Sequence, residues 1–492
     1  MKLLKKIPFF LFLLVLFFCL HGLLENYGNI SAGELTGVGL VALGCILLLY
    51  LLSWLTSKNY LLASLVTFFI GAWYLFFGAI HDSIKAISFL RFLQSYSILL
   101  PVLLLTNIAV IWWLKCNKQV YNRLFLYLNI LFIIFCVADG ALLVNKHYTQ
   151  KNSSTQADQL FDISKVKAKP NVYLLVFDCY AGYKSLQDSF AFKNDSLYDF
   201  LAQRSFKVLP AFSNYNFTFF SMASLLNMQY ITDDYTNKIA VQSDMQKRVR
   251  EIKNAEVFTI FNSMGYSVEN YSIFDIKDKP GISGNNSIIP MHAYLVTNKI
   301  FHNRLVLDLG YLLYNFNYFA RKHIFEHDDD NKASYNKLMA TIEKKASPPK
   351  MVYAHLLLPH APYFKDSLGK YLPIKEFNTE SKEHYLSYLK YSNTVIRSVI
   401  TKITAGDPAA VVLLMSDHGY NNKGSVRISD SAQIAAERYS FNNICAVRFP
   451  NGQHDSIAPA ISNVNIFRYL FNAQFQQKMP YLKDSMVWVN HD

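Results

Sequence analysis

The chain has 492 residues, of which 52% are hydrophobic and 17% are charged, and its formal net charge is +13. This composition is too apolar for a disordered chain and too polar for a protein that lies entirely in a membrane. Six cysteines are too few for a disulfide framework in so long a chain, and no basic block with interleaved aromatic residues indicates nucleic-acid binding, so we expect no nucleic-acid partner.

Five apolar stretches in the first 145 residues each approach the roughly 20 residues that cross the hydrocarbon core of a bilayer. The first could be a cleaved signal peptide, because lysines precede it, but it lacks a cleavage site of small residues and four further stretches follow it. The sequence therefore predicts a transmembrane domain of five helices over residues 1–145, with spans at residues 7–24, 35–56, 60–80, 95–114 and 124–144.

The distribution of basic residues predicts the orientation of these spans. The loop after the first span carries Glu25 and Glu34 and no basic residue. Basic residues gather at the N-terminus and between the fourth and fifth spans: Lys2, Lys5, Lys6, Lys115, Lys118 and Arg123. We therefore expect a multi-pass protein of the inner (plasma) membrane, with a cytoplasmic N-terminus and an extracytoplasmic (periplasmic) C-terminal domain.

Among residues of the Asp, Glu, His, Lys and Arg types, two lie within the predicted spans, His21 in the first and Asp139 in the last. A carboxylate at this depth costs a few kcal/mol unless it is paired or close to the interface. On the predicted topology both residues lie near the outer ends of their helices. Two interpretations stay open: interfacial snorkelling, or a polar pocket for a lipid head group.

Residues 146–169 are polar and rich in lysine, which is typical of a linker, and the pattern changes at residue 170. The runs NVYLLVFD, KMVYAHLLLPH, AAVVLLMSD and FNNICAVRF are short and apolar, as buried strands of a parallel sheet are. Because helical segments separate them, residues 170–492 are predicted to form an α/β domain with a doubly wound, mostly parallel sheet. The predicted helices cover residues 193–204, 216–229, 334–346 and 380–402.

Polar residues follow three of the predicted strands. The first strand ends at Asp178, the second at His360, and the third at Asp417, His418 and Gly419. Ligands of such sheets bind outside the carboxyl ends of the strands. Carboxylate and imidazole groups together suit one divalent metal ion, Zn²⁺ or Mn²⁺. Each residue alone could instead be a helix cap or a satisfied polar group.

Three hydroxyl residues recur every third position in SNYNFTFFSMASLLNM: Thr218, Ser221 and Ser224. They can be ordinary capping and packing residues. Thr218, however, falls at the predicted start of a helix, where free backbone N–H groups and the helix dipole favour a bound anion. Its hydroxyl would become a nucleophile if a metal ion lowered its pKa. Ser221 and Ser224 lie deeper in the helix and are less able to reach a phosphate.

These patches occur in the order seen in the alkaline phosphatase/sulfatase superfamily: PNVYLLVFD with Asp178, NFTFFSMAS with Thr218, PHAPY with His360, and SDHG at 416–419. With five N-terminal spans, the chain resembles the membrane branch of that superfamily, which includes lipoteichoic acid synthases and lipid A phosphoethanolamine transferases. The resemblance implies that one metal ion is held by Asp178, Thr218, Asp417 and His418. It also implies that His360 contacts the substrate phosphate or the leaving group.

The resemblance implies a metal-dependent phosphotransferase that moves a phospholipid head group, phosphoethanolamine or phosphoglycerol, to an envelope glycan or lipid through a phospho-threonine intermediate. The transferases usually carry Glu at the position of Asp178, and the chain lacks the Cys/Ser-x-Pro-x-Arg motif of true sulfatases, which disfavours formylglycine chemistry. One alternative is a phosphodiesterase or sulfatase-type hydrolase on the same site, and another is a non-catalytic envelope scaffold. The sequence leaves open whether Cys179 and Cys445 form a disulfide.

Overall fold

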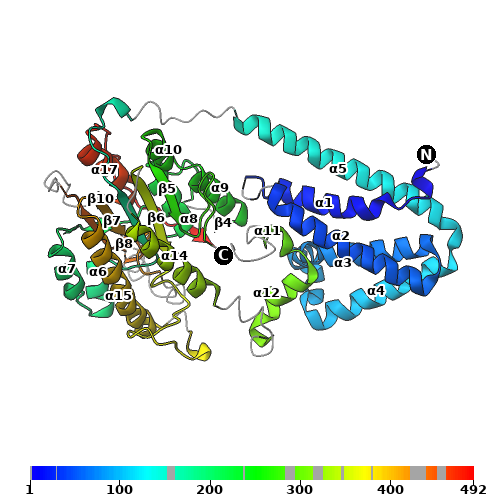
Figure 1. The fold of residues 1–492 in the computed structure, drawn as a ribbon. Helices are drawn as coiled ribbons and strands as arrows, with labels where there is room; N and C mark the ends of the chain where they lie inside the picture. The colour runs from blue at the N-terminus through cyan, green and yellow to red at the C-terminus, as the bar shows by residue number, and fades with distance from the viewer. Residues whose placement is uncertain are drawn as a thin grey trace. The chain divides into compact units, whose positions relative to one another are not determined.

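The computed structural model describes residues 3–28, 30, 32–151, 161–235, 239–282, 294–313, 325–344, 348–377, 381–421, 439–450 and 461–491. The chain forms two compact units (Figure 1). One unit, Met1–Ser154 with Gly284–Ile324, is helical, and the other, Thr155–Ser283 with Phe325–Asp492, is an α/β domain.

The helical unit contains a long apolar helix at each of the five predicted spans. Four of them are long and apolar enough to cross a membrane, and α1, with 17 residues, is slightly shorter. Their buried side chains, such as Phe10, Leu65 and Phe125, form one apolar core. The predicted bundle of five helices is therefore confirmed. Its helices are α1 (Phe9–Glu25), α2 (Ala32–Ser57), α3 (Tyr60–Ala86), α4 (Tyr96–Cys116) and α5 (Tyr121–Lys151).

Two short helices from the middle of the chain also belong to this unit, α11 (Tyr294–Thr297) and α12 (Phe301–Leu313). The backbone N–H of Gly78 on α3 donates to the carbonyl oxygen of Lys299 at 2.7 Å. A Cβ on Gly78 would lie 2.7 Å from Lys299 Cα, so only glycine permits this approach. The boundaries predicted at residues 145 and 170 do not include this return of the chain to the membrane helices.

His21 of the first span and Asp139 of the last span contact each other. His21 Nδ1 lies 3.0 Å from Asp139 Oδ2, and Asp139 is buried. The carboxylate is therefore paired within the helical unit, between α1 and α5.

The α/β domain is built on a six-stranded sheet with the order β2-β9-β7-β1-β6-β5. The central pairs β7–β1, β1–β6 and β6–β5 are parallel, whereas β9 is antiparallel to both of its neighbours. This arrangement confirms the predicted mostly parallel sheet. Its strands are β1 (Val172–Phe177), β2 (Lys207–Val208), β5 (Ser267–Tyr271), β6 (Lys350–Leu356), β7 (Val411–Met415) and β9 (Cys445–Arg448).

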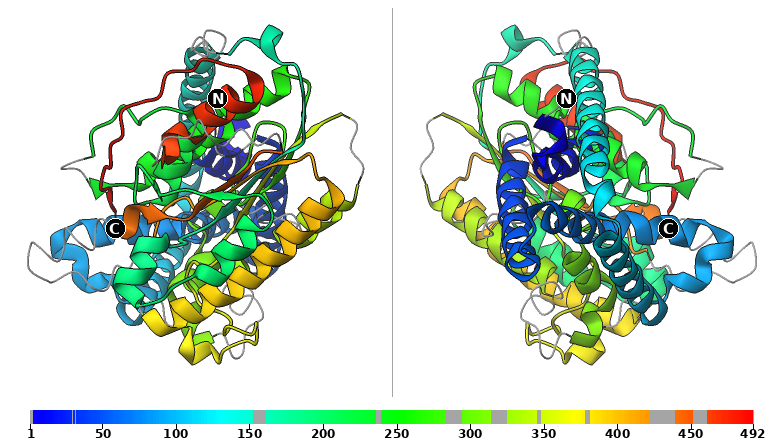
Figure 2. Two further views of the ribbon diagram at one scale, coloured as in Figure 1. Left: turned by 90° about the vertical axis from the view of Figure 1, so that its left-hand side faces the viewer. Right: turned by 90° about the vertical axis from the view of Figure 1, so that its right-hand side faces the viewer.

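Helices cover both faces of this sheet (Figures 1 and 2). Every residue of β1 is buried, because alternate side chains enter the cores on opposite faces. Val176 packs with α8 (Thr218–Asn227), α9 (Gln242–Lys253), α10 (Glu256–Ser263) and α17 (Ile466–Phe475). Phe177 packs on the other face, with α6 (Tyr183–Phe190), α7 (Asp195–Ala202), α14 (Glu326–Glu343) and α15 (Lys382–Gly406).

The predicted helices 193–204, 216–229 and 380–402 correspond to α7, α8 and α15. The helix predicted at 334–346 begins earlier, at Glu326, where its polar first turns carry no apolar periodicity. Strand β5 and helices α6, α9, α10 and α17 were not predicted. Sequence SVENY of β5 has a Glu and an Asn that interrupt the apolar run by which a strand is recognised.

Candidate active site

The register of the parallel strands brings three chain segments to one edge of the sheet. Val176 of β1 pairs with Met415 of β7 on one side and with His355 of β6 on the other. Asp178 and Asp417 each follow their paired residues by two positions, so they lie side by side at the carboxyl ends of the strands. Because side chains alternate between the two faces of a sheet, both lie on the same face as Val176 and Met415, which face α8. The carboxylates therefore meet the start of α8, where Thr218 lies.

The four residues predicted as metal ligands lie together. His418 Nε2 is 3.3 Å from Thr218 Oγ1, 3.4 Å from Asp417 Oδ2 and 3.9 Å from Asp178 Oδ1. All four side chains are buried, with exposed fractions of 8% for Thr218, 4% for His418, 2% for Asp178 and 0% for Asp417. This proximity is what the prediction requires, although their roles stay predictions.

The open ligand atoms of this cluster fit a divalent cation. Asp178 Oδ1, Asp417 Oδ2 and His355 Nε2 are buried without a hydrogen-bond partner. The ligand atoms that Asp178, His355 and Asp417 can offer all lie within 4.8 Å of one another. Two buried carboxylates so close together repel each other unless a positive charge compensates them. The oxygen and imidazole ligands suit Zn²⁺ or Mn²⁺.

His418 is held in a fixed orientation by the turn that carries it. Its Nδ1 lies 2.8 Å from the carbonyl oxygen of Gly419, which can only accept, so Nδ1 carries a proton and Nε2 is the ring nitrogen that faces the cluster. A Cβ on Gly419 would lie 2.4 Å from the carbonyl oxygen of Asn442. Glycine is therefore required at this position for the backbone to pass so close.

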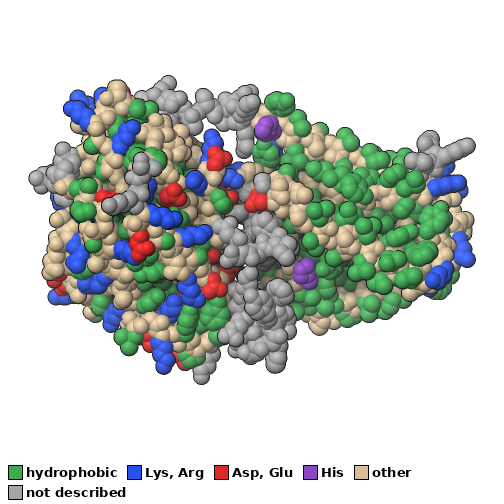
Figure 3. All heavy atoms as spheres, viewed as in Figure 1, with side chains coloured by type: hydrophobic (Ala, Val, Ile, Leu, Met, Phe, Trp, Pro, Cys, Tyr) green, Lys and Arg blue, Asp and Glu red, His purple; other side chains and the backbone are tan. Residues whose placement is uncertain are grey.

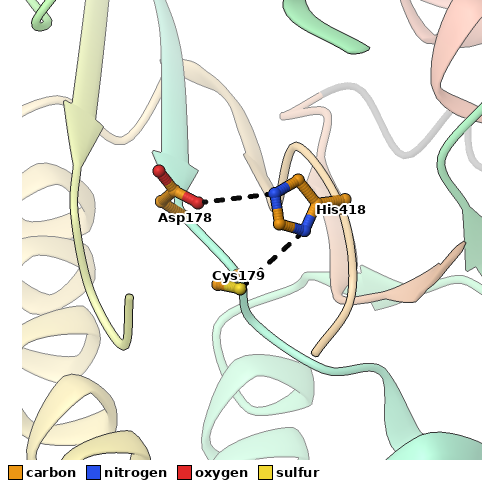
Figure 4. A group of neighbouring side chains, drawn as sticks. All are labelled: Asp178, Cys179 and His418. Carbon is orange, nitrogen blue, oxygen red and sulfur yellow. Dashed lines mark hydrogen bonds and ion pairs between the residues drawn. The ribbon is translucent and has the colours of Figure 1, made fainter. Parts of the chain in front are cut away.

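Cys179 lies on the opposite side of the imidazole ring from Asp178 (Figure 4). Its Sγ is 3.8 Å from His418 Nδ1, and its backbone N–H donates to Asp417 Oδ1 at 3.2 Å. The residue has φ of +65°, which turns the chain sharply after β1. Asp178, Cys179 and His418 form a second group with ligand atoms within 4.8 Å. Both Cys179 and Cys445 are free thiols, which answers the question of their pairing.

The charges of the cluster shift two pKa values in opposite directions. Burial would raise the pKa of Asp178, but its interactions with His360, His355 and His418 outweigh burial and lower it. Burial would lower the pKa of His418, but Asp417, Cys179 and Asp178 raise it well above its usual value. Each buried group thus favours its charged form because of its neighbours.

The other two hydroxyls of the series have structural partners. Ser221 Oγ donates to the backbone carbonyl of Asp417, and Ser224 Oγ donates to that of Gln229 at 2.8 Å. Ser221 therefore stabilises the turn that carries Asp417 and His418, whereas Ser224 stabilises the end of α8. Thr218 alone of the three directs its oxygen at His418 Nε2.

His360 lies beside the cluster on the loop after β6. It is half-buried, its interaction with Asp178 contributes to the low pKa of that carboxyl, and its ring centroid is 6.1 Å from that of His327 on α14. Among the described residues, no hydrogen bond or ion pair joins His360 directly to Thr218, Asp417 or His418. Its role at the leaving group stays a prediction.

Two histidines of this region were missed by sequence reasoning. His355 lies inside β6, within an apolar run that is read as a buried strand, and only the register of β6 against β1 brings it to Asp178. His327 lies in the polar first turn of α14, far from any motif in the sequence. A histidine amid the apolar residues of KMVYAHLLLPH was the one available signal for His355.

A family model for Sulfatase matches residues 183–473, more than half of the chain. The chain therefore belongs to the sulfatase family, as its resemblance to the alkaline phosphatase/sulfatase superfamily predicts, and is a sulfatase-like enzyme. Thr218, His360, Asp417 and His418 lie within the matched residues, and Asp178 lies just before them.

Several solved structures are similar to the chain at low identity. The C-terminal periplasmic domain of EcEptC from Escherichia coli, in complex with Zn, is 11% identical, with a TM-score of 0.41 over 66% of this chain and 90% of that chain. The phosphonate monoester hydrolase SpPMH from Silicibacter pomeroyi is 12% identical, with a TM-score of 0.38 over 65% and 76%.

A third structure, a putative sulfatase from Bacteroides thetaiotaomicron VPI-5482, is 11% identical, with a TM-score of 0.37 over 65% of this chain and 74% of that chain. Likenesses this distant carry no argument about substrate. No curated protein matches the sequence.

Proposed function

We propose that this enzyme is a membrane-anchored phosphotransferase that moves a phospholipid head group, phosphoethanolamine or phosphoglycerol, to a glycan or lipid of the cell envelope. One observation carries the proposal: a hydroxyl at the start of a helix, Thr218, lies 3.3 Å from His418 Nε2 beside two buried carboxylates with open oxygens. The helices of the N-terminal unit support a phospholipid donor, because they would hold the domain at a leaflet that contains it.

Asp178, Asp417, His418 and the Thr218 oxygen would hold a divalent cation, Zn²⁺ or Mn²⁺, and His355 is a further candidate ligand. When bound, such an ion lowers the pKa of a hydroxyl and neutralises phosphate oxygens. The N–H of Phe220 donates to the carbonyl oxygen of Phe217 at 3.1 Å, so the N–H groups of Thr218 and Phe219, at the start of α8, are the ones that can bind the phosphate oxygens. The Nδ1–H of His418 stays on the Gly419 carbonyl and keeps Nε2 directed at Thr218.

The reaction proceeds in two transfers. After its hydroxyl proton passes to solvent, Thr218 Oγ attacks phosphorus, the bond to the diacylglycerol oxygen breaks, and a phospho-threonine forms. His360 gives its proton to the leaving oxygen and then takes one from the hydroxyl of the acceptor, which attacks the phospho-threonine. The head group leaves on the acceptor, and Thr218 is regenerated. On the predicted topology this occurs outside the cytoplasm, at the inner membrane.

The experiment that tests this function follows release of diacylglycerol from a labelled phospholipid by the full-length protein. Removing a nucleophile abolishes the covalent step, so Thr218→Ala should lose activity by several orders of magnitude. Thr218→Ser should retain measurable turnover because it preserves the hydroxyl. The matched control is Ser224→Ala, which removes another hydroxyl of α8. The Ser224 hydroxyl donates to the carbonyl oxygen of Gln229 rather than to a residue of the cluster, so its loss should cost only about 1 kcal/mol of stability.

Turnover by Thr218→Ala at near wild-type rate would overturn the assignment of the nucleophile. If label appeared in water-soluble product without any acceptor, the enzyme would instead be a hydrolase of the phosphodiesterase or sulfatase type on the same site. That result would overturn the transferase proposal and leave the family unchanged.

A further inference from the structure

A groove of about 430 Å³ runs along α5 of the helical unit, next to the N-terminal turn Leu3–Lys5. Its lining has two unlike ends. Lys5, Arg123 and Tyr127 make one end polar and basic, and Leu126, Ile130 and Ile134 make the other end apolar. A groove with a cationic end and an apolar wall can bind an amphipathic anion.

A buried asparagine builds the cationic end. Asn129 Nδ2 donates to the carbonyl oxygens of Leu4 at 2.8 Å and Ile7 at 2.9 Å, and Asn129 Oδ1 accepts from the N–H of Phe10 at 2.7 Å. The Asn129 side chain is fully buried between these partners. These three hydrogen bonds fix the N-terminal turn on α5, so Lys5 is held at the groove beside Arg123.

No acidic residue near in sequence compensates these two cations. Residues 1–24 and 83–138 contain no Asp or Glu. Asp139, on the same helix as Arg123, is 16 positions away, which is about 24 Å along the axis. Figure 3 shows basic side chains gathered at the end of this unit, beyond a surface that is mostly hydrophobic. An anion from outside the chain can therefore supply the complementary charge.

The apolar wall has the length of one leaflet of a membrane. Arg123, Tyr127, Ile130 and Ile134 follow the spacing of one helix face, and this face spans about 16 Å along the axis. Half of the hydrocarbon core of a bilayer is about 15 Å. Ile130 and Ile134 are exposed on α5, one of the helices that are long and apolar enough to cross a membrane. An acyl chain lying on this face would start at the cations and end near the bilayer centre.

We propose that this groove binds an anionic phospholipid, with its phosphate and anionic head group between Lys5 and Arg123 and an acyl chain against Leu126, Ile130 and Ile134. On the predicted topology the lipid belongs to the cytoplasmic leaflet, opposite the leaflet that would hold the donor. The site shares no residue with the candidate active site and does not depend on the proposed reaction.

Native mass spectrometry of the full-length protein, released from detergent with added phosphatidylglycerol or phosphatidylcholine, tests this proposal. Each basic residue near a membrane surface contributes roughly fivefold to the binding of an anionic lipid, so Lys5→Gln with Arg123→Gln should weaken phosphatidylglycerol binding roughly 25-fold. Binding of phosphatidylcholine should change little. The matched control is Lys118→Gln, which removes a charge close to α5 but outside the groove lining and should keep wild-type binding.

A second variant, Ile130→Trp, fills the apolar wall without changing charge, and it should also reduce the fraction of protein that carries phosphatidylglycerol. Equal binding of the two lipids by the wild-type protein would overturn the proposal. So would an equal loss in Lys118→Gln and in the double variant, because it would mean that general attraction by basic residues accounts for the binding.

Discussion

Replacing Asp417 with Asn removes one of the two carboxylates of the candidate metal site and preserves the shape of the side chain. Asp417 Oδ2 is buried and has no hydrogen-bond partner, whereas Oδ1 accepts from the N–H of Cys179. An amide can still accept that bond, but it supplies no negative charge to a cation. The Asp417→Asn protein should therefore fold and fail to hold a divalent metal ion.

The magnitude follows from linkage between binding and folding. A ligand that binds only the folded state at 100 times its Kd stabilises that state by about 2.7 kcal/mol. Unfolding entropy is about 2.1 cal/mol/K per residue, and the α/β unit has roughly 300 residues, so the metal ion should raise the Tm of this unit by about 4 °C. The Asp417→Asn protein should show almost none of this increase.

Thermal unfolding of the full-length protein, after chelation and again after addition of Zn²⁺ or Mn²⁺, measures this difference. Because each variant is compared with its own metal-free form, any direct effect of the substitution on stability cancels. Ser224→Ala serves as the control and should keep the full increase, since Ser224 Oγ binds Gln229 rather than the cluster. If Asp417→Asn retained stoichiometric metal and the 4 °C increase, the metal ion would bind elsewhere.

Three further predictions concern the turn, the pH dependence of stability and the topology. Gly419→Ala should destabilise the domain by about 1–3 kcal/mol and abolish metal binding, measured by denaturant unfolding and metal content, because its Cβ would lie 2.4 Å from a backbone oxygen. Burial would raise the pKa of Asp328, but hydrogen bonds from Lys332 and Lys365 lower it. Its stabilising effect should thus be full above about pH 4 and lost as pH falls through the folded-state pKa, and Asp328→Asn should remove this dependence from acid unfolding curves. A reporter fused after residue 160 should show phosphatase activity and no green fluorescence; the opposite pattern would contradict an extracytoplasmic domain.

The parts of the fold that have a strong local signal were predictable from sequence. Uniformly apolar runs such as VYLLVF identify buried parallel strands, and apolar stretches of about 20 residues identify the membrane helices. The return of residues 294–313 to those helices was not predictable, because it depends on a close approach of Lys299 to Gly78 rather than on local pattern.

The same distinction holds for the candidate site. Asp178, Asp417 and His418 lie at the carboxyl ends of strands, where ligands of a parallel sheet bind, so they could be predicted as site residues. His355 lies inside strand β6, and its relation to Asp178 is set by the register of two strands whose paired residues are 179 positions apart in sequence, which no local pattern encodes. His327 reaches His360 only because α14 begins eight residues earlier than its apolar periodicity indicates.

A covalent phospho-threonine at the start of α8 would be detected by the intact mass of the full-length protein after brief incubation with phospholipid and no acceptor. We expect an added mass of one phosphoethanolamine or phosphoglycerol group, located on Thr218 by peptide mapping and absent from Thr218→Ala. Release of diacylglycerol without any such adduct, or an adduct on another residue, would contradict it.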